Sequence, residues 1–164
     1  MQAEPRSALR EVVAAHPLAE LLDCPPEAGV LLNGSARTVQ LETGESVFRQ
    51  GEPCAGLYLV VSGQFVRRAE RLKSRLALGT VRPGDLVELA AALGSGIHTY
   101  TLSAEAPGSL LMLPIEALRS AFQAHPPLRM RLLEELAREV CRAYIACTQN
   151  PPVQRKRRNG HATA

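Results

Sequence analysis

The side chains that could bind a metal ion or attack a substrate are scattered along this chain. They are four histidines and four cysteines, at His16, His98, His125 and His161 and at Cys24, Cys54, Cys141 and Cys147. The histidines lack the short spacing typical of zinc sites, and no two cysteines form a CxxC pair. No Ser-His-Asp set, Walker glycine loop or pair of carboxylates stands out in the sequence. We therefore expect no metal, no cofactor and no catalytic residue, and we predict that the protein is not an enzyme.

Composition predicts one domain with short additions at its ends. The chain has 164 residues, 46% of them hydrophobic, which is enough for one core but not for two. The formal net charge is +3, and the basic run 155–158 alone contributes four positive charges, so the rest of the chain is close to neutral. We expect a helical extension at 1–17, the domain at 18–149 and a disordered basic tail at 150–164. Because terminal charge runs are usually solvated, we expect no specific DNA binding.

The cysteine pattern and the absence of long apolar runs indicate where in the cell the protein is located. Scattered cysteines without a basic and apolar leader favour a reduced, cytoplasmic protein. The uncharged runs are shorter than the roughly 18 to 20 apolar residues that a membrane-spanning helix needs. We expect no membrane association.

Short runs rich in Val, Leu, Tyr and Thr predict about seven strands. They are Thr38–Glu42, Ser46–Arg49, Leu57–Val61, Phe65–Arg68, Arg75–Thr80, His98–Ala104 and Ser109–Leu113. Glycines separate most of these runs, and the spacing is typical of a β-barrel or jelly-roll sandwich. Between two of the runs, Ser62-Gly63-Gln64-Phe65 predicts a tight hairpin with a positive φ at Gly63.

Helical periodicity occupies both ends of the chain. Ser7–Leu22 is predicted as a pair of short helices, and another short helix after Pro25 is expected to stop at Asn33-Gly34. Two further helices are predicted at Pro114–Ala124 and Pro127–Gln149.

The long C-terminal helix carries an apolar stripe with 3,4,3,4 spacing. Its members are Leu133, Leu136, Val140, Ala143 and Cys147. The stripe either packs on the barrel of its own chain or forms the seam of a parallel two-helix homodimer, and two heptads leave both alternatives open.

Several blocks of this sequence carry a resemblance to a known family. The blocks are Gly44–Glu52, Gly56–Gly63, Leu78-Gly79 followed by Pro83-Gly84-Asp85, and the helix that starts at Pro114. From roughly Pro17 to Cys147 the chain resembles the cyclic nucleotide-binding domain of the catabolite-activator and Fnr-type (Crp/Fnr) regulators. The resemblance implies a mainly β fold with flanking helices: a double-stranded β-helix, or jelly-roll-like β-roll, with N-terminal helices and a long C-terminal helix.

Family members that bind cyclic nucleotides hold the phosphate with helix N-terminal amides and an arginine, and the ribose hydroxyl with a glutamate. Two alignments after Asp85 are open. With a one-residue gap, Glu88 matches that glutamate, Val87 replaces a glycine and His98 replaces the arginine. Without the gap, Glu88 takes the glycine position and Leu89 replaces the glutamate. The arginine is absent in both alignments.

The resemblance therefore implies a ligand-binding region without its strongest cation. Its residues are Val87, Glu88, Leu89, Ala90, His98 and Thr99. Losing a charge-assisted arginine contact removes roughly 2–4 kcal/mol of binding free energy. Imidazole, with an ordinary pKa of about 6.5, is mostly neutral at pH 7. We expect a weakly bound cyclic nucleotide or another small anionic ligand.

Two other properties of the family are not expected here. Fnr-type proteins can carry an iron–sulfur cluster on several N-terminal cysteines, but Cys24 alone lies in that region, and His98 alone is a weak basis for a haem site. The family's winged helix-turn-helix follows the long helix, whereas about 15 residues follow Gln149 in this sequence.

Together these observations lead to two functional hypotheses. The first is a stand-alone sensory domain that binds a small ligand and signals through its C-terminal helix to an unknown protein partner. The alternative is a degenerate, ligand-free module for dimerisation or protein interaction.

Overall fold

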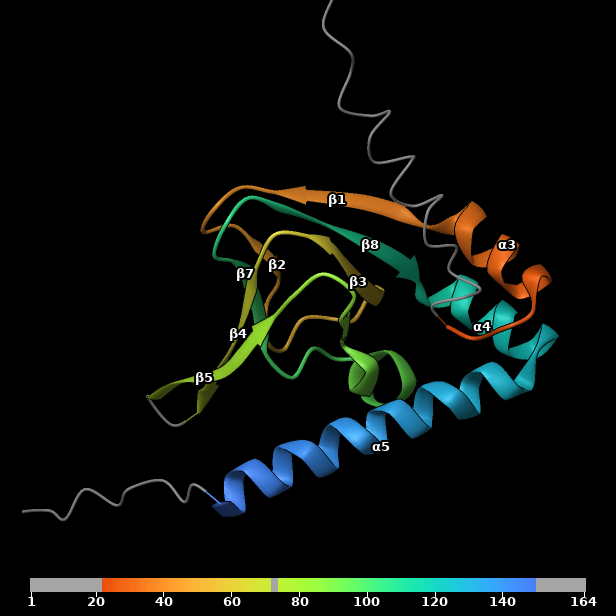
Figure 1. The fold of residues 1–164 in the computed structure, drawn as a ribbon. Coiled ribbons are helices and arrows are strands. Elements are labelled where there is room, and N and C mark those ends of the chain that lie inside the picture. The colour runs from red at the N-terminus through yellow and green to blue at the C-terminus, as the bar shows by residue number, and fades with distance from the viewer. Residues whose placement is uncertain (1–21, 72–73, 150–164) are drawn as a thin grey trace, which may run out of the picture.

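The computed structural model describes residues 22–71 and 74–149, in which one helix precedes a set of strands and two helices follow them (Figure 1). In order along the chain, the first seven elements are α3 (Pro26–Ser35), β1 (Arg37–Leu41), β2 (Ser46–Phe48), β3 (Gly56–Ser62), β4 (Phe65–Arg71), β5 (Ser74–Val81) and β6 (Leu86–Val87). The remaining elements are η1 (Ala91–Ser95), β7 (Thr101–Ala104), β8 (Gly108–Pro114), α4 (Ile115–Ala124) and α5 (Pro126–Gln149). Here η1 is a single turn of π-helix.

The strands form two antiparallel four-stranded sheets. One sheet has the order β1-β8-β3-β6 and the other β2-β7-β4-β5. Strands close in sequence are therefore often in different sheets, and the pairing of β1 with β8 joins the two ends of the strand region. This arrangement is a jelly-roll-like β-roll, as the sequence predicts.

Strand β3 is buried on both faces because it lies between two cores. Leu57 and Leu59 belong to the core that the first sheet shares with the helices. Tyr58 and Val60 belong to the core inside the roll, together with Phe65 of the opposite sheet. Since side chains of a strand alternate between its faces, one strand supplies both cores.

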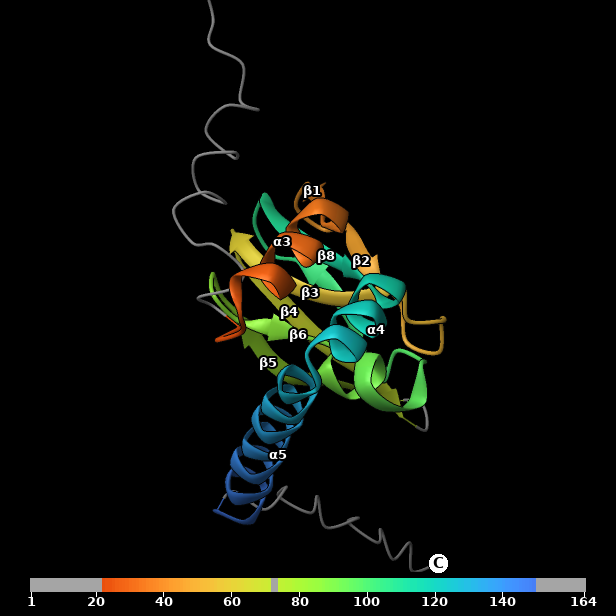
Figure 2. The ribbon, with the colours of Figure 1, turned by 90° about the vertical axis from the view of Figure 1, so that its right-hand side faces the viewer.

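The helices cover one end of the roll. Helices α3 and α4 pack on each other there, and α5 begins beside α4 and then runs along one side of the roll, past η1 (Figures 1 and 2). Leu128 and Leu132 anchor the first turns of α5 in the helical core, with at most 3% of each residue exposed. The rest of α5 is largely exposed on its outer side.

The structure confirms the predicted fold class and corrects three details. Ser62–Phe65 is not a hairpin, because β3 pairs with β8 and β6 whereas β4 pairs with β5 and β7. The turn instead carries the chain from one sheet to the other. Gly63 does have the predicted positive φ, +86°, and a Cβ there would lie 2.6 Å from the Cα of Gly108. The close approach of two backbones therefore requires glycine.

The other two corrections concern element ends. Helix α3 continues through Asn33-Gly34 to Ser35, because the helical turn is closed by a hydrogen bond from the Ala36 amide to the Asn33 carbonyl. Strand β7 begins at Thr101 rather than at His98. Most of the predicted helical pair before residue 22, and the basic tail after residue 149, lie outside the described residues.

Candidate functional site

A cavity of about 930 Å³ lies between the roll and α5. On the roll side, the segment Gly84–Ala90 lines it, Val87 excepted, together with Arg67, Thr99 and Tyr100. On the α5 side, the lining residues lie between Arg131 and Ala143. The cavity therefore joins the region that the sequence singles out to the long helix.

The structure brings four of the six predicted ligand-binding residues to this cavity. They are Glu88, Leu89, Ala90 and Thr99. Val87 and His98 do not line it, because their side chains point into the roll, where the residues are 1% and 2% exposed. Val87 packs in the core inside the roll.

The predicted seam on α5 is divided between two environments. Leu136, Val140 and Ala143 line the cavity and so face the roll of their own chain. Val140 is also 59% exposed, and Leu133 is partly buried outside the cavity. Cys147 lies in the helix, but its side chain is outside the described residues.

Glu88 has an unusual backbone conformation. Its φ is +73°, in the left-handed region that costs a residue with a Cβ roughly 1–2 kcal/mol and that glycine adopts freely. Of the two alignments, the one without a gap places the family's glycine at Glu88. This conformation fits a glycine position, and the alignment without a gap stays a prediction. In that alignment Leu89 stands at the position of the ribose-binding glutamate.

The Glu88 side chain forms a buried hydrogen bond with His98. Its Oε2 lies 2.9 Å from Nδ1 of His98, and both residues are less than 5% exposed. The ring of Phe48 stacks on the imidazole with 3.8 Å between the centroids and an angle of 7°. Burial raises the pKa of the Glu88 carboxyl, while the hydrogen bond with His98 and the proximity of Tyr100 partly oppose this.

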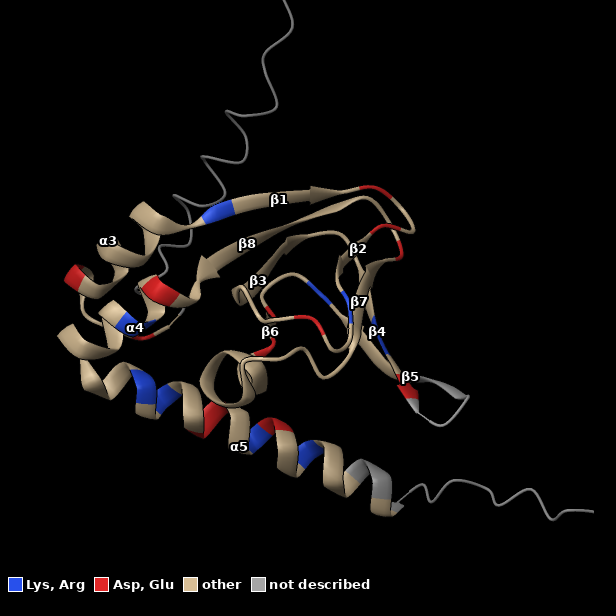
Figure 3. Cartoon of the chain, turned by 180° about the vertical axis from the view of Figure 1, so that it is seen from behind, with Lys and Arg blue, Asp and Glu red and all other residues tan. Residues whose placement is uncertain are grey.

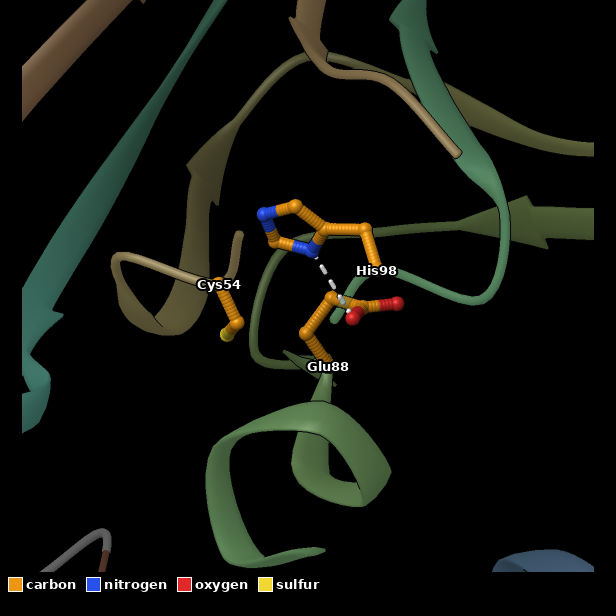
Figure 4. Close-up of side chains that lie close together, drawn as sticks. All are labelled: Cys54, Glu88 and His98. Atoms are coloured by element: carbon orange, nitrogen blue, oxygen red, sulfur yellow. Dashed lines mark hydrogen bonds and ion pairs between the residues drawn. The ribbon is translucent and has the colours of Figure 1, made fainter. Parts of the chain in front are cut away.

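Cys54 lies beside this pair. Backbone hydrogen bonds hold its segment to that of His98: the Cys54 amide donates to the Gly96 carbonyl at 2.8 Å, and the His98 amide donates to the Glu52 carbonyl at 2.9 Å. Donor atoms of Cys54, Glu88 and His98 all lie within 4.8 Å of one another (Figure 4). This group could not be predicted from the sequence, because its members come from three separate loops and have no motif spacing.

Arg67 of β4 is a cavity residue that the sequence analysis missed. Its Nη1 donates to Oε1 of Glu139 on α5 at 2.7 Å, and its guanidinium lies 5.8 Å from the centre of the Tyr100 ring. Its Nε is buried and has no hydrogen-bond partner. Strand alternation could have found it, because Arg67 lies two residues after the inward-facing Phe65 and so shares its face.

Most charges on the α5 side of the cavity are paired within the chain, and Figure 3 shows basic and acidic residues interleaved along the helix. Arg138 and Arg142 each lie 3.0 Å from an oxygen of Glu135, and their hydrogen bonds lower the pKa of that carboxyl. Arg131 pairs with Asp23. Arg67 differs because its unpartnered donor, Nε, is buried.

A family model and solved structures of known proteins match this chain and share its fold. The family model described as "Cyclic nucleotide-binding domain" matches residues 38–125. The sensor domain of the transcriptional regulator DNR from Pseudomonas aeruginosa is 23% identical, with a TM-score of 0.67, and the match covers 92% of this chain and 99% of that one. The catabolite activator protein of Thermus thermophilus is 24% identical, with a TM-score of 0.69, over 82% of this chain and 62% of that one. These structures confirm the fold.

A curated relative is much longer than this chain. Patatin-like phospholipase domain-containing protein 7 from Mus musculus is 32% identical over 104 residues, which are 62% of this chain and 8% of that protein. The chain thus spans a small part of this relative.

Among the described residues, no helix is both long and apolar enough to cross a membrane.

Proposed function

We propose that this chain, which belongs to the cyclic nucleotide-binding domain family, is a sensory domain that binds a small anionic ligand in the cavity between the roll and α5. It acts by binding rather than by catalysis. The signal passes through α5 to a partner protein in the cytoplasm.

Arg67 is the observation that supports this proposal. A buried donor without a partner costs roughly 1–3 kcal/mol, and the Nε of Arg67 is such a donor in the wall of the cavity. A phosphate or carboxylate group accepts two parallel hydrogen bonds from a guanidinium. A bound anion would therefore satisfy Nε and compete with Glu139 for the same guanidinium.

The cavity suits a ligand of nucleotide size. Its volume of about 930 Å³ falls within the roughly 300–1,000 Å³ of typical small-molecule sites. Cyclic nucleotides would bind more weakly than in family members that have the phosphate-binding arginine, because this chain lacks that arginine. In addition, Leu89 offers the ribose no acceptor. Arg67 supplies a cation from another strand, so the phosphate would lie closer to α5.

The same ion pair provides the route for the signal. In the structure, Arg67 and Glu139 connect β4 to α5 across the cavity. An anion that takes over Arg67 would free Glu139 and loosen the outer part of α5 from the roll. The ligand would then shift a two-state equilibrium by its differential affinity for the two positions of α5.

Dimerisation through α5 is part of this proposal. Exposed or partly exposed apolar residues repeat there with 3,4,3,4 spacing, and we call them the α5 stripe: Met130, Leu133, Ala137, Val140 and Tyr144. The stripe shares Leu133 and Val140 with the predicted seam. Of the stripe residues, Val140 alone also lines the cavity. A dimer on this stripe would therefore leave most of the cavity wall available to a ligand.

Calorimetric titration with cAMP, cGMP and cyclic di-GMP tests the ligand proposal. We expect at least one of them to bind saturably to the wild type, and Arg67→Ala to weaken that binding at least about 30-fold, which corresponds to 2 kcal/mol. Arg119→Ala is the matched control, because Arg119 also pairs with a glutamate, at 2.7 Å, but lies on the exposed face of α4. Equal binding by Arg67→Ala and wild type would refute the role of Arg67.

The alternative function, a ligand-free dimerisation module, is favoured by the closed Arg67–Glu139 pair and the exposed α5 stripe. It predicts no binding of the three nucleotides and a dimer that Tyr144→Glu dissociates. Because both functions include this dimer, the nucleotide titrations separate them. Sedimentation of wild type and Tyr144→Glu tests the dimer that they share.

A further inference from the structure

We propose that Cys54, Glu88 and His98 form a binding site for a divalent transition-metal ion, with zinc as the best fit to their donor atoms. The three side chains converge from separate segments: the loop before β3, the turn after β6 and the loop before β7 (Figure 4). Cys54 and His98 do not line the cavity between the roll and α5, whereas Glu88 does. The metal site therefore borders the ligand site proposed above, and its test uses metal binding instead of nucleotide binding.

The distances are close to those of a metal site. The three donor atoms lie within 4.8 Å of one another, and Nδ1 of His98 is 2.9 Å from Oε2 of Glu88. Zinc binds nitrogen and oxygen at about 2.0–2.2 Å and sulfur at about 2.3 Å, so its ligands are separated by roughly 3.4–3.8 Å. A shift of about 1 Å, mainly of the Cys54 sulfur toward the pair, would complete the geometry. The side chain of a loop cysteine can make such a shift by rotation.

The types of the three ligand atoms indicate which metal ion would bind. A thiolate, an imidazole and a carboxylate are the three kinds of ligand that zinc takes in proteins, whereas magnesium and calcium take oxygen only. Three protein ligands leave one tetrahedral position, which water would fill. The Cys54 thiol would lose its proton on binding, because a thiolate and not a thiol is the ligand.

A buried oxygen without a partner is the second observation. Oε1 of Glu88 has no hydrogen-bond partner, although the residue is 4% exposed. A buried Glu–His pair that served only to join two loops would leave this oxygen uncompensated. A cation bound to the carboxylate would compensate it.

The surrounding structure holds His98 and Glu88 in place, whereas the Cys54 thiol would give up its hydrogen bond on binding a metal as a thiolate. Phe48 stacks on the His98 ring, and the Cys54 Sγ donates to the Gly56 carbonyl at 3.2 Å. Glu88 is held in a left-handed backbone conformation that a glycine would adopt without strain. Strain of this kind concentrates at functional sites, where the surrounding structure maintains it.

Cobalt binding tests the proposal, because a thiolate ligand gives Co²⁺ a near-ultraviolet charge-transfer band. The full chain, stripped with a chelator and kept reduced, is titrated with CoCl₂ and then with ZnCl₂. We expect one Co²⁺ per chain with a charge-transfer band that Zn²⁺ abolishes by displacement. Cys54→Ser should lose the band and weaken the affinity by more than about 100-fold, since it removes a direct ligand and losing even an outer partner costs 10- to 100-fold.

Cys141→Ser is the matched control, because Cys141 is exposed on α5. It should bind Co²⁺ as the wild type does. Glu88→Gly provides a second variant that fits the backbone, and it should lose binding while its thermal unfolding still shows a folded protein. The proposal is overturned if folded wild type binds no Co²⁺, or if the charge-transfer band survives in Cys54→Ser.

Discussion

The ion pair between Arg67 and Glu139 joins α5 to the roll, and its coupling energy can be measured. The two side chains are 23% and 36% exposed, and the contact is 2.7 Å long. Exposed pairs contribute about 0.2–1 kcal/mol to stability, and breaking fully buried pairs costs about 3–5 kcal/mol. For this half-buried pair we expect a coupling energy of about 1 kcal/mol, or roughly a five-fold change in the unfolding equilibrium constant.

A double-mutant cycle isolates that coupling. Urea unfolding is followed for the wild type, Arg67→Ala, Glu139→Gln and the double variant, and the coupling is the part of the double effect that the single effects do not explain. The cycle removes the separate loss of the Arg67 contact with Tyr100, which both variants that lack Arg67 share. In thermal unfolding, 1 kcal/mol corresponds to about 2–4 °C for a chain of this size.

The pair Arg119–Glu116 on α4 is the control cycle. Its side chains are 65% and 75% exposed and three residues apart on one helix, so its coupling should stay below about 0.5 kcal/mol. A coupling at Arg67–Glu139 no larger than that of the control would refute the reasoning. Added 0.5 M NaCl should reduce both couplings, and the exposed pair more strongly.

Three further predictions concern stability and thiol reactivity. Gly63→Ala should destabilise the fold by more than about 2 kcal/mol in urea unfolding, because a Cβ would lie 2.6 Å from backbone at a φ of +86°. Gly44 has a similar φ of +88° but no atom within 4 Å of a Cβ, so Gly44→Ala should cost only about 1 kcal/mol. Equal effects of the two substitutions would contradict the steric argument. Phe65→Ala should cost about 3–5 kcal/mol, since the ring is fully buried inside the roll, and a loss below 1 kcal/mol would exclude that packing. Iodoacetamide followed by peptide mass spectrometry should find Cys141 alkylated before Cys24, because burial raises the pKa of the Cys24 thiol and keeps it protonated; the Cys24 rate should rise with pH, and early labelling of Cys24 would contradict its burial.

The roll could be predicted from the sequence because its signals are local. Alternating apolar residues mark most of the strands, and the positive φ of Gly63 follows from its place in a turn. Strand β6 was not predicted because it has two residues, and the π-turn η1 has no reliable sequence pattern. Pairing could not be predicted either, since Ser62–Phe65 looks like a hairpin and only long-range contacts show that it joins two sheets.

The candidate site was predicted in part. The resemblance placed Glu88 and Thr99 at the cavity, but it put His98 there too, because a sequence position does not show which way a loop residue points. Arg67 was not predicted because it lies on the inward face of β4, far in sequence from the position of the family's arginine. Cys54 was missed because backbone hydrogen bonds between distant loops bring it to Glu88 and His98.

The pairing of β1 with β8 has a consequence for the synthesis of this protein. Arg37 pairs with Met112, which the ribosome adds 75 residues later. At about 5–20 residues per second, β1 waits roughly 4–15 s for its partner. During that interval the residues of β1 lack the strand that they pair with, so the roll can close only after β8 has been synthesised.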